Sequence, residues 1–393
     1  MRMLICNGRV FSGKHGFFRG SVRIKGKKFE KIYREDVLPR NQERIIDAKG
    51  GWVIPGLVDI HLHGCAGYDF GDASEEALQE IAVYQAEHGI TTICPTTMTM
   101  PVEQILRTLR TIHTFCSREE LTESEAGFRG AQIAGIHLEG PFLSPEKKGS
   151  QESGNIAKPD PELFLKFQKA AGNRIRLLDL APEREGALEL IRRFRDQVVI
   201  SLAHSSADYD TAVQAFRAGA SHVTHLYNAM SPYGHREPGI VGAAGDNPAC
   251  MVELIADGMH NHPSVVRNTF RMFGADRIVL ISDSMRAAGM GDGTYELGGH
   301  TVYVREGRAL LADGTIAASV TNLFACMRRC VKNMGISLYD AVKCASLNPA
   351  RSIGIDAWTG SIEEGKIADA LILDRESLEL QHVIHRGRLL REP

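Results

Sequence analysis

The sequence predicts an α/β protein in which a closed (β/α)8, TIM-like barrel is joined by a small β-domain formed from both ends of the chain. The barrel is predicted by eight short apolar runs between residues 52 and 286, separated by segments of helical periodicity. The β-domain is predicted by residues 1–51 and 360–393, where apolar and polar side chains alternate as in strands. Neither end alone could bury a useful core, so we expect the two to pair. The expected boundaries are 1–51 and 357–393 for the β-domain and 52–356 for the barrel.

The eight runs are rich in β-branched residues and leucine, which is typical of strands buried on both faces of a parallel sheet. A helix is predicted at 74–89 by a Ser-Glu start and a glycine stop, and another at 209–220. Because eight strand–helix units suit a barrel and no G-x-G-x-x-G follows the first run, an open dinucleotide-binding sheet is disfavoured. The runs cover residues 53–64, 91–97, 132–141, 175–183, 198–206, 222–230, 251–260 and 277–285.

Composition excludes several classes of protein. With 393 residues, 43% hydrophobic and 24% charged, the chain can bury a large core. Its 46 basic and 48 acidic side chains give a net charge of -2, so no overall positive field attracts nucleic acid or an anionic membrane. The N-terminus lacks the apolar core of a signal peptide, and no run approaches the roughly 20 apolar residues of a membrane span. We expect a cytoplasmic protein.

Polar side chains gather where the predicted strands end. In a barrel the carboxyl ends of the strands form one face, and the active sites of this fold lie there. We therefore expect a single site from these positions. They are His61 and His63 at the end of the first run, Glu139 at the end of the third, His204 at the end of the fifth, His225 and Asn228 in the sixth, His260 in the seventh and Asp283 in the eighth.

Two groups of these residues suit a metal ion. His61 and His63 are two apart on a strand, so both point the same way, although a lone His-x-His also occurs in packed cores. Glu139, His204 and His225 supply two imidazoles and one carboxylate, the type of set that binds catalytic zinc and leaves a position open. Zinc is the expected metal, and the same ligands suit Fe, Co or Mn.

Other residues near this face suit catalysis and anion binding. Asp283 could take a proton from water and return it to a leaving nitrogen, or instead form an ion pair or cap a helix. Arg236, in the sequence GHREPG, suits a phosphate group or a surface ion pair.

The motifs PGLVDIHLHG, HLEGPF, LAPE, THLYNAM, HREPG, DGMH and SDS, with the closing GSIEEGKIADALILD, resemble those of the N-acetylglucosamine-6-phosphate deacetylases of the amidohydrolase superfamily. The resemblance runs through nearly the whole chain. It implies a barrel with a β-sandwich built from both termini, a divalent metal and a homodimer. It also implies hydrolysis of the acetamide of N-acetyl-D-glucosamine 6-phosphate to D-glucosamine 6-phosphate and acetate, in amino-sugar catabolism and cell-wall sugar recycling.

The resemblance also implies a role for individual residues. Glu139, His204 and His225 match the principal metal ligands, and Asp283 matches the catalytic acid and base. Arg236 matches an arginine that reaches the substrate phosphate from the adjacent subunit. Further substrate contacts are implied for Asn228, Ala229 and His260 and, through the main chain, for Ile316, Ala317 and Ala318.

Two features vary within the family that the chain resembles. Some members lack the His-x-His and use one metal, so His61 and His63 would allow a second ion here. Some members place a histidine in the loop after HLEGPF, where it contacts the substrate near the acetyl group. The matching residue is Gln151, which cannot polarise a carbonyl as that histidine would, while Ser150 is still expected to touch the substrate.

Two alternatives stay open at this point. The chain could be an amidohydrolase for another substrate: N-acetylgalactosamine 6-phosphate, an N-acyl amino acid or a cyclic amide. The cyclic-amide reading is disfavoured, because such members often bridge two metals with a carboxylated lysine and the fourth run, IRLLDLAPE, has no lysine. The chain could also be a non-catalytic binding protein, but such descendants typically lose metal ligands, and here every expected ligand is present.

Overall fold

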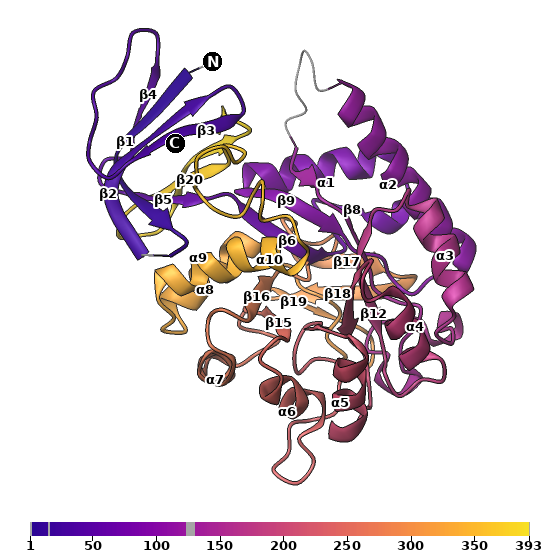
Figure 1. Cartoon of the computed structure of the whole chain (residues 1–393). Helices are drawn as coiled ribbons and strands as arrows, with labels where there is room; N and C mark the ends of the chain where they lie inside the picture. Colours follow the sequence, from indigo (N-terminus) through magenta and orange to yellow (C-terminus); the bar gives the residue numbers. More distant parts are fainter. Residues whose placement is uncertain (1, 15, 123–129, 393) are drawn as a thin grey trace.

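A curled wall of parallel strands forms the centre of the fold (Figure 1). The computed structural model describes residues 2–14, 16–122 and 130–392. Single bridges between Thr96 and His137 and between Leu62 and Ser284 join the two sheets of the wall at both edges, which makes it barrel-like. The strands are β6 (Leu57–Leu62), β9 (Ile90–Pro95), β10 (Gln132–Ile133), β11 (Ile136–Leu138), β12 (Ile175–Leu180), β13 (Val199–Leu202), β14 (His222–Val223), β15 (Met251–Ile255) and β16 (Ile278–Ile281). All eight predicted runs overlap these strands, which confirms the barrel-like α/β prediction.

Helices follow the strands and surround the wall (Figure 1). The predicted Ser74 start caps α1, since its hydroxyl accepts the N–H of Ala77 at 3.1 Å. Asp208 caps α5 in the same way and accepts the N–H of Thr211 at 2.8 Å. The helices are α1 (Glu75–Glu87), α2 (Val102–Thr122), α3 (Pro161–Ala170), α4 (Ala187–Phe194), α5 (Tyr209–Ala218), α6 (Gly239–Asp246), α7 (Pro263–Phe273), α8 (Leu323–Lys332), α9 (Leu338–Ala345) and α10 (Leu347–Ser352).

Strands from both ends of the chain lie in one sheet beside the barrel (Figure 1). The two ends meet where β20 runs antiparallel to β5, with Leu371 opposite Ile54. Side chains of β20 alternate: Leu371 and Leu373 join the core shared with the barrel, whereas Ile372 joins a separate apolar cluster of the terminal sheet. The strands are β1 (Arg2–Ser12), β2 (Gly16–Lys25), β3 (Lys28–Tyr33), β4 (Arg44–Asp47), β5 (Trp52–Pro55), β20 (Ala370–Leu373), β21 (Leu380–His385) and β22 (Arg388–Arg391).

A further antiparallel sheet follows the last strand of the wall. It consists of β17 (Gly293–Leu297), β18 (His300–Arg305) and β19 (Arg308–Leu310), and it packs on the barrel core through Val302 and Val304. β18 alternates between buried and exposed residues and β17 is mostly exposed, so no continuous apolar run marked them in the sequence. Two short strands, β7 (Gly64–Cys65) and β8 (Tyr68–Asp69), form a hairpin after β6.

Within residues 2–14, 16–122 and 130–392, no helix has both the length and the apolar character needed to cross a membrane.

Candidate active site

Three polar residues at the strand ends have a left-handed backbone. His204 follows β13, His225 follows β14 and Asp283 follows β16, with φ angles of 44°, 29° and 49°. Residues other than glycine avoid this region at a cost of about 1–3 kcal/mol each, and such strain is concentrated at functional sites. At Asp283 hydrogen bonds hold the strained backbone: its N–H donates to the carbonyl of His61 at 3.0 Å, and its carbonyl accepts the N–H of Ser319 at 2.7 Å.

Glu139 lies between the two imidazoles that the sequence analysis grouped with it. Its Oε1 is 3.1 Å from Nε2 of His204 and 3.1 Å from Nε2 of His225, and the two nitrogens are 3.0 Å apart. The carboxylate is 1% exposed. The structure therefore brings together, from three different strand ends, the two nitrogens and one oxygen that suit a tetrahedral zinc ion with an open position.

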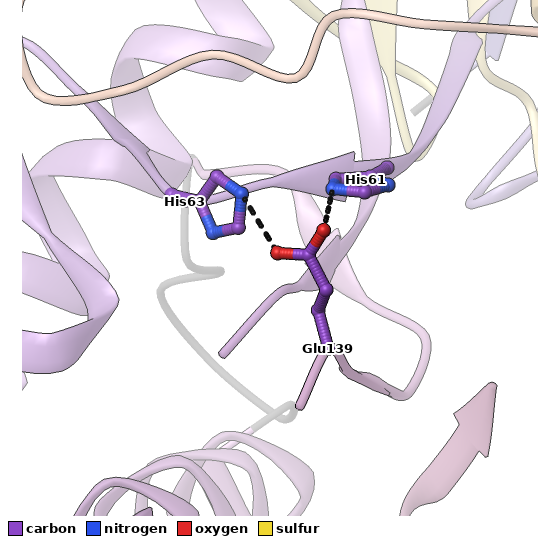
Figure 2. Close-up of side chains that lie close together, drawn as sticks. All are labelled: His61, His63 and Glu139. Carbon is purple, nitrogen blue, oxygen red and sulfur yellow. Dashed lines mark ion pairs between the residues drawn. The ribbon is translucent and has the colours of Figure 1, made fainter. Parts of the chain in front are cut away.

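His61 and His63 approach the same carboxylate from β6, as Figure 2 shows. Nε2 of His61 is 3.7 Å from Oε1 of Glu139, and Nε2 of His63 is 3.5 Å from Oε2. Both nitrogens also lie near Oδ1 of Asp283, at 3.5 and 3.2 Å. Nε2 of His61 is buried and has no hydrogen-bond partner among the described residues, as expected of an atom that ligates an ion.

The protonation states of Glu139 and His61 suit a cation. Burial lowers the pKa of His61 well below its ordinary value, which favours the neutral imidazole that binds metals. Burial alone would raise the pKa of Glu139, but hydrogen bonds from its two neighbouring histidines hold that pKa well below the usual range. For His63, burial is outweighed by the hydrogen bond to Asp283 and the charge of Glu139, which raise its pKa to about 9. The carboxylate charge thus persists in a buried site.

A second layer of buried polar residues, which the sequence analysis missed, supports the site residues described above. Oε2 of Glu253 is 2.9 Å from Nδ1 of His61 and accepts the backbone N–H of His225 at 3.2 Å. Oδ1 of Asp179 is 2.9 Å from Nε2 of His137, whose Nδ1 lies 3.0 Å from the carbonyl of Ile60. The signal for Glu253 and Asp179 is present in the sequence: each is an acidic residue inside an otherwise apolar run, MVELI and LLDL.

A cavity of about 310 Å³ opens above these side chains. It is lined by most of the predicted site residues: His63, Glu139, Ser150, His204, His225, Asn228, Ala229, His260, Asp283, Ile316 and Ala318. Met98, Gly149, Gln151 and Thr315 complete the lining. Three predicted residues are not part of it: His61 and Ala317 are fully buried, and Arg236 is exposed with its guanidinium 2.7 Å from Nε2 of His235.

His260 is fixed at the cavity by Asp257. Nδ1 of His260 is 2.8 Å from Oδ2 of Asp257, and Oδ1 of the same carboxylate accepts the N–H groups of Met259 and His260 at 2.8 and 2.9 Å. This leaves Nε2 of His260 for a ligand. Burial would lower the pKa of His260, but the hydrogen bond and charge of Asp257 raise it overall, so the ring carries positive charge more readily.

Comparison with known proteins assigns the family. Residues 52–390 match the amidohydrolase family. The chain belongs to this family. It is 41% identical over 338 residues to N-acetylglucosamine-6-phosphate deacetylase of Bacillus subtilis (strain 168), a match that covers 86% of this chain and 84% of that one. It is 38% identical over 344 residues to N-acetylgalactosamine-6-phosphate deacetylase of Escherichia coli O157:H7, covering 85% and 86%.

The fold of this amidohydrolase is also that of a solved deacetylase. An aspartate-to-alanine mutant of N-acetyl-D-glucosamine-6-phosphate deacetylase from Mycobacterium smegmatis, in complex with N-acetyl-D-glucosamine-6-phosphate, superposes with a TM-score of 0.89. The match covers 99% of both chains at 31% identity. The family resemblance of the sequence motifs is thereby confirmed.

The Asp257–His260 contact gives a prediction on protonation. Asp257→Asn removes the charge that raises the pKa of His260, so that pKa should fall. NMR titration of the histidine ring protons measures it, with the His260 signal assigned from a His260→Asn variant. The control is Asp160→Asn, which changes a carboxylate at the start of α3. An unchanged His260 titration in Asp257→Asn would contradict this account.

Proposed function

We infer that this amidohydrolase removes the acetyl group of N-acetyl-D-glucosamine 6-phosphate, giving D-glucosamine 6-phosphate and acetate, in amino-sugar catabolism and cell-wall sugar recycling. The observation that carries the proposal is the meeting of Glu139, His204, His225 and Asp283 at the floor of one cavity. The similarity to deacetylases of that name, one of them with this compound bound, supports the choice of substrate.

The residues at the cavity floor fit a divalent ion. Two imidazole nitrogens 3.0 Å apart, both 3.1 Å from one carboxylate oxygen, satisfy a cation better than they satisfy one another. We propose that Glu139, His204 and His225 hold one ion, most simply zinc, and that His61 and His63 allow a second beside it. A bound divalent ion would supply Lewis acidity, lowering the pKa of water to about 7 and polarising the acetyl carbonyl.

Asp283 is proposed as the acid and base of the reaction. Its carboxylate lines the cavity, with 10% of the side chain exposed, and its backbone is fixed on both sides by hydrogen bonds. It would take the proton of the attacking water and then give a proton to the amide nitrogen as the C–N bond breaks. Because the residue is already held in place, little reorganisation is needed between the two proton transfers.

The cavity wall is proposed to orient the sugar phosphate. Ser150, Asn228, Ala229 and the main chain of Ile316, Ala317 and Ala318 would contact the sugar, and His260 would contact the sugar or its phosphate. Binding energy from such remote contacts places the acetamide over the reacting groups.

Arg236 is proposed to bind the phosphate of a neighbouring subunit's substrate, which makes the active form a homodimer. In the described part of the chain Arg236 is exposed and does not line the cavity of its own subunit. A guanidinium is well suited to bidentate contact with phosphate, so its place is explained if it serves a second copy.

The domain organisation follows the same resemblance. We propose that residues 1–51 and 357–393 form a β-sandwich and that residues 52–356 form a (β/α)8 barrel, with β5 at the start of the second range pairing in the terminal sheet. The pairing of β20 with β5 and the separate apolar cluster of the terminal sheet support the sandwich. The cytoplasm is the proposed location, in keeping with a phosphorylated substrate.

Acetate release tests the function. Purified protein with measured metal content is assayed on the 6-phosphates of N-acetylglucosamine and N-acetylgalactosamine and on the unphosphorylated sugars. We expect the glucosamine derivative to be preferred, and Asp283→Asn to lose turnover by about 10²–10⁴-fold while keeping metal and substrate binding. The 38% identity to a galactosamine-specific relative makes the other epimer the second candidate, and its preference would replace our choice. Near-wild-type turnover by Asp283→Asn would remove that residue from the mechanism.

Arg236 and the dimer are tested together. Arg236→Met should raise KM for the phosphorylated sugar at least about 10-fold, the loss expected for a charge-assisted contact, with little effect on an unphosphorylated analogue. Mixing Arg236→Met chains with Asp283→Asn chains distinguishes the two possible arrangements. If the arginine serves the neighbouring subunit, each mixed dimer regains one intact site and activity returns. No recovery, with mixed dimers formed, would place Arg236 at its own site or outside any site.

A further inference from the structure

Gln151 has no role in the mechanism above, yet it is held at the centre of the site. It is 2% exposed and lies in the loop that follows β11. Its Nε2 donates to Oε2 of Glu139 at 2.7 Å, and its Oε1 accepts the backbone N–H of Thr99 at 2.7 Å. The side chain of Gln151 therefore links Thr99, in the segment after β9, to the carboxylate of Glu139, which follows β11.

The direction of the Gln151 amide is fixed by its partners. A backbone N–H can only donate, so the amide oxygen must face Thr99 and the amide nitrogen must face Glu139. An ionised carboxylate can only accept, which agrees with that orientation. Both contacts are short and buried, so they fix the amide and, through it, one oxygen of Glu139.

The two oxygens of Glu139 consequently face different histidines. Oε1 contacts the nitrogens of His204 and His225 and lies 3.7 Å from Nε2 of His61, whereas Oε2 lies 3.5 Å from Nε2 of His63. The terminal torsion of a glutamate is broad, so nothing intrinsic to the residue selects this rotation. The hydrogen bond from Gln151 to Oε2 selects it together with the two histidine contacts on Oε1.

The backbone of the same loop supports another residue of the site. The carbonyl of Lys147 lies 2.9 Å from Nδ1 of His204, which leaves Nε2 of that ring to face Glu139. The N–H of Gln151 donates to the carbonyl of Lys148 at 2.9 Å, and the turn between them needs the left-handed φ of 56° at Gly149. The loop of residues 147–151 thus orients both His204 and Glu139.

We propose that Gln151 is a positioning residue that holds Glu139 with Oε1 at the His204–His225 pair and Oε2 toward His63, so that the carboxylate can serve two divalent ions. This inference shares one premise with the proposed function, which is that these side chains bind metal. Some members of the family that the chain resembles have a substrate-contacting histidine at this position. In this chain the glutamine would instead position Glu139.

Zinc binding by Gln151→Met tests the proposal. Methionine keeps the length of the side chain but cannot donate to Glu139. The matched control is Gln168→Met in α3, because Gln168 is also buried and also makes two side-chain contacts, at 3.2 and 3.1 Å, to the backbone of Ile175. Each variant is first stripped of metal with a chelator. Its zinc affinity is then measured, without substrate, by titrating zinc ion in competition with a chromophoric chelator. The number of zinc ions retained per chain is measured by emission spectrometry.

Wild type and Gln168→Met should each bind two zinc ions, and Gln151→Met should bind the weaker ion about 10- to 100-fold less tightly, the loss typical of outer-shell partners. Gln151→Asn, whose shorter amide cannot reach both partners, should also weaken the second ion and serves if the methionine variant fails to fold. Zinc affinities of both variants equal to wild type, or a wild type that never binds more than one ion, would overturn the proposal. A raised KM with unchanged zinc binding would instead make Gln151 a substrate contact. Because these titrations need no substrate, failure of the deacetylase assay would leave their outcome unaffected.

Discussion

The Glu139 carboxylate, buried among four histidines, is the interaction on which the rest of the site depends. An ionised carboxylate in such a place costs several kcal/mol unless it is paired, and here its hydrogen-bonding neighbours keep its pKa well below the ordinary range. Two of the histidines contact Oε1 and a third lies near Oε2. A negative charge surrounded by ring nitrogens, one of them without a partner among the described residues, is an arrangement that a divalent cation completes.

The barrel-like wall supplies what this charge needs. Its strands end on one side of the fold, where the backbone turns through left-handed residues at His204, His225 and Asp283. The strain of these turns is offset by apolar packing along the strands, most of whose residues are buried. Below the ligands, Glu253 fixes His61, and above them the loop with Gln151 fixes Glu139. These contacts fix His61 and Glu139 through the protein itself, which reduces the reorganisation needed at reaction.

The sequence predicted the strands and the grouping of site residues for physical reasons. Continuous apolar runs mark strands buried on both faces, and parallel order in a barrel brings their polar ends together, so Glu139, His204 and His225 could be grouped although they are far apart in the chain. Contacts between side chains were not predictable in the same way. Nothing local shows that Glu253 meets His61 or that Gln151 meets Glu139, because both pairs depend on which residues of different strands lie opposite one another. The antiparallel sheet after β16 was missed because β17 and β18, with several exposed residues each, carry no continuous apolar run.

Anomalous diffraction tests most directly whether Glu139, His204 and His225 meet around a metal ion. Crystals of the zinc-loaded chain, measured on both sides of the zinc absorption edge, should show a peak bounded by Oε1 of Glu139 and the Nε2 atoms of His204 and His225. Absence of a peak there in protein shown to carry zinc, or zinc found only elsewhere on the molecule, would contradict the account.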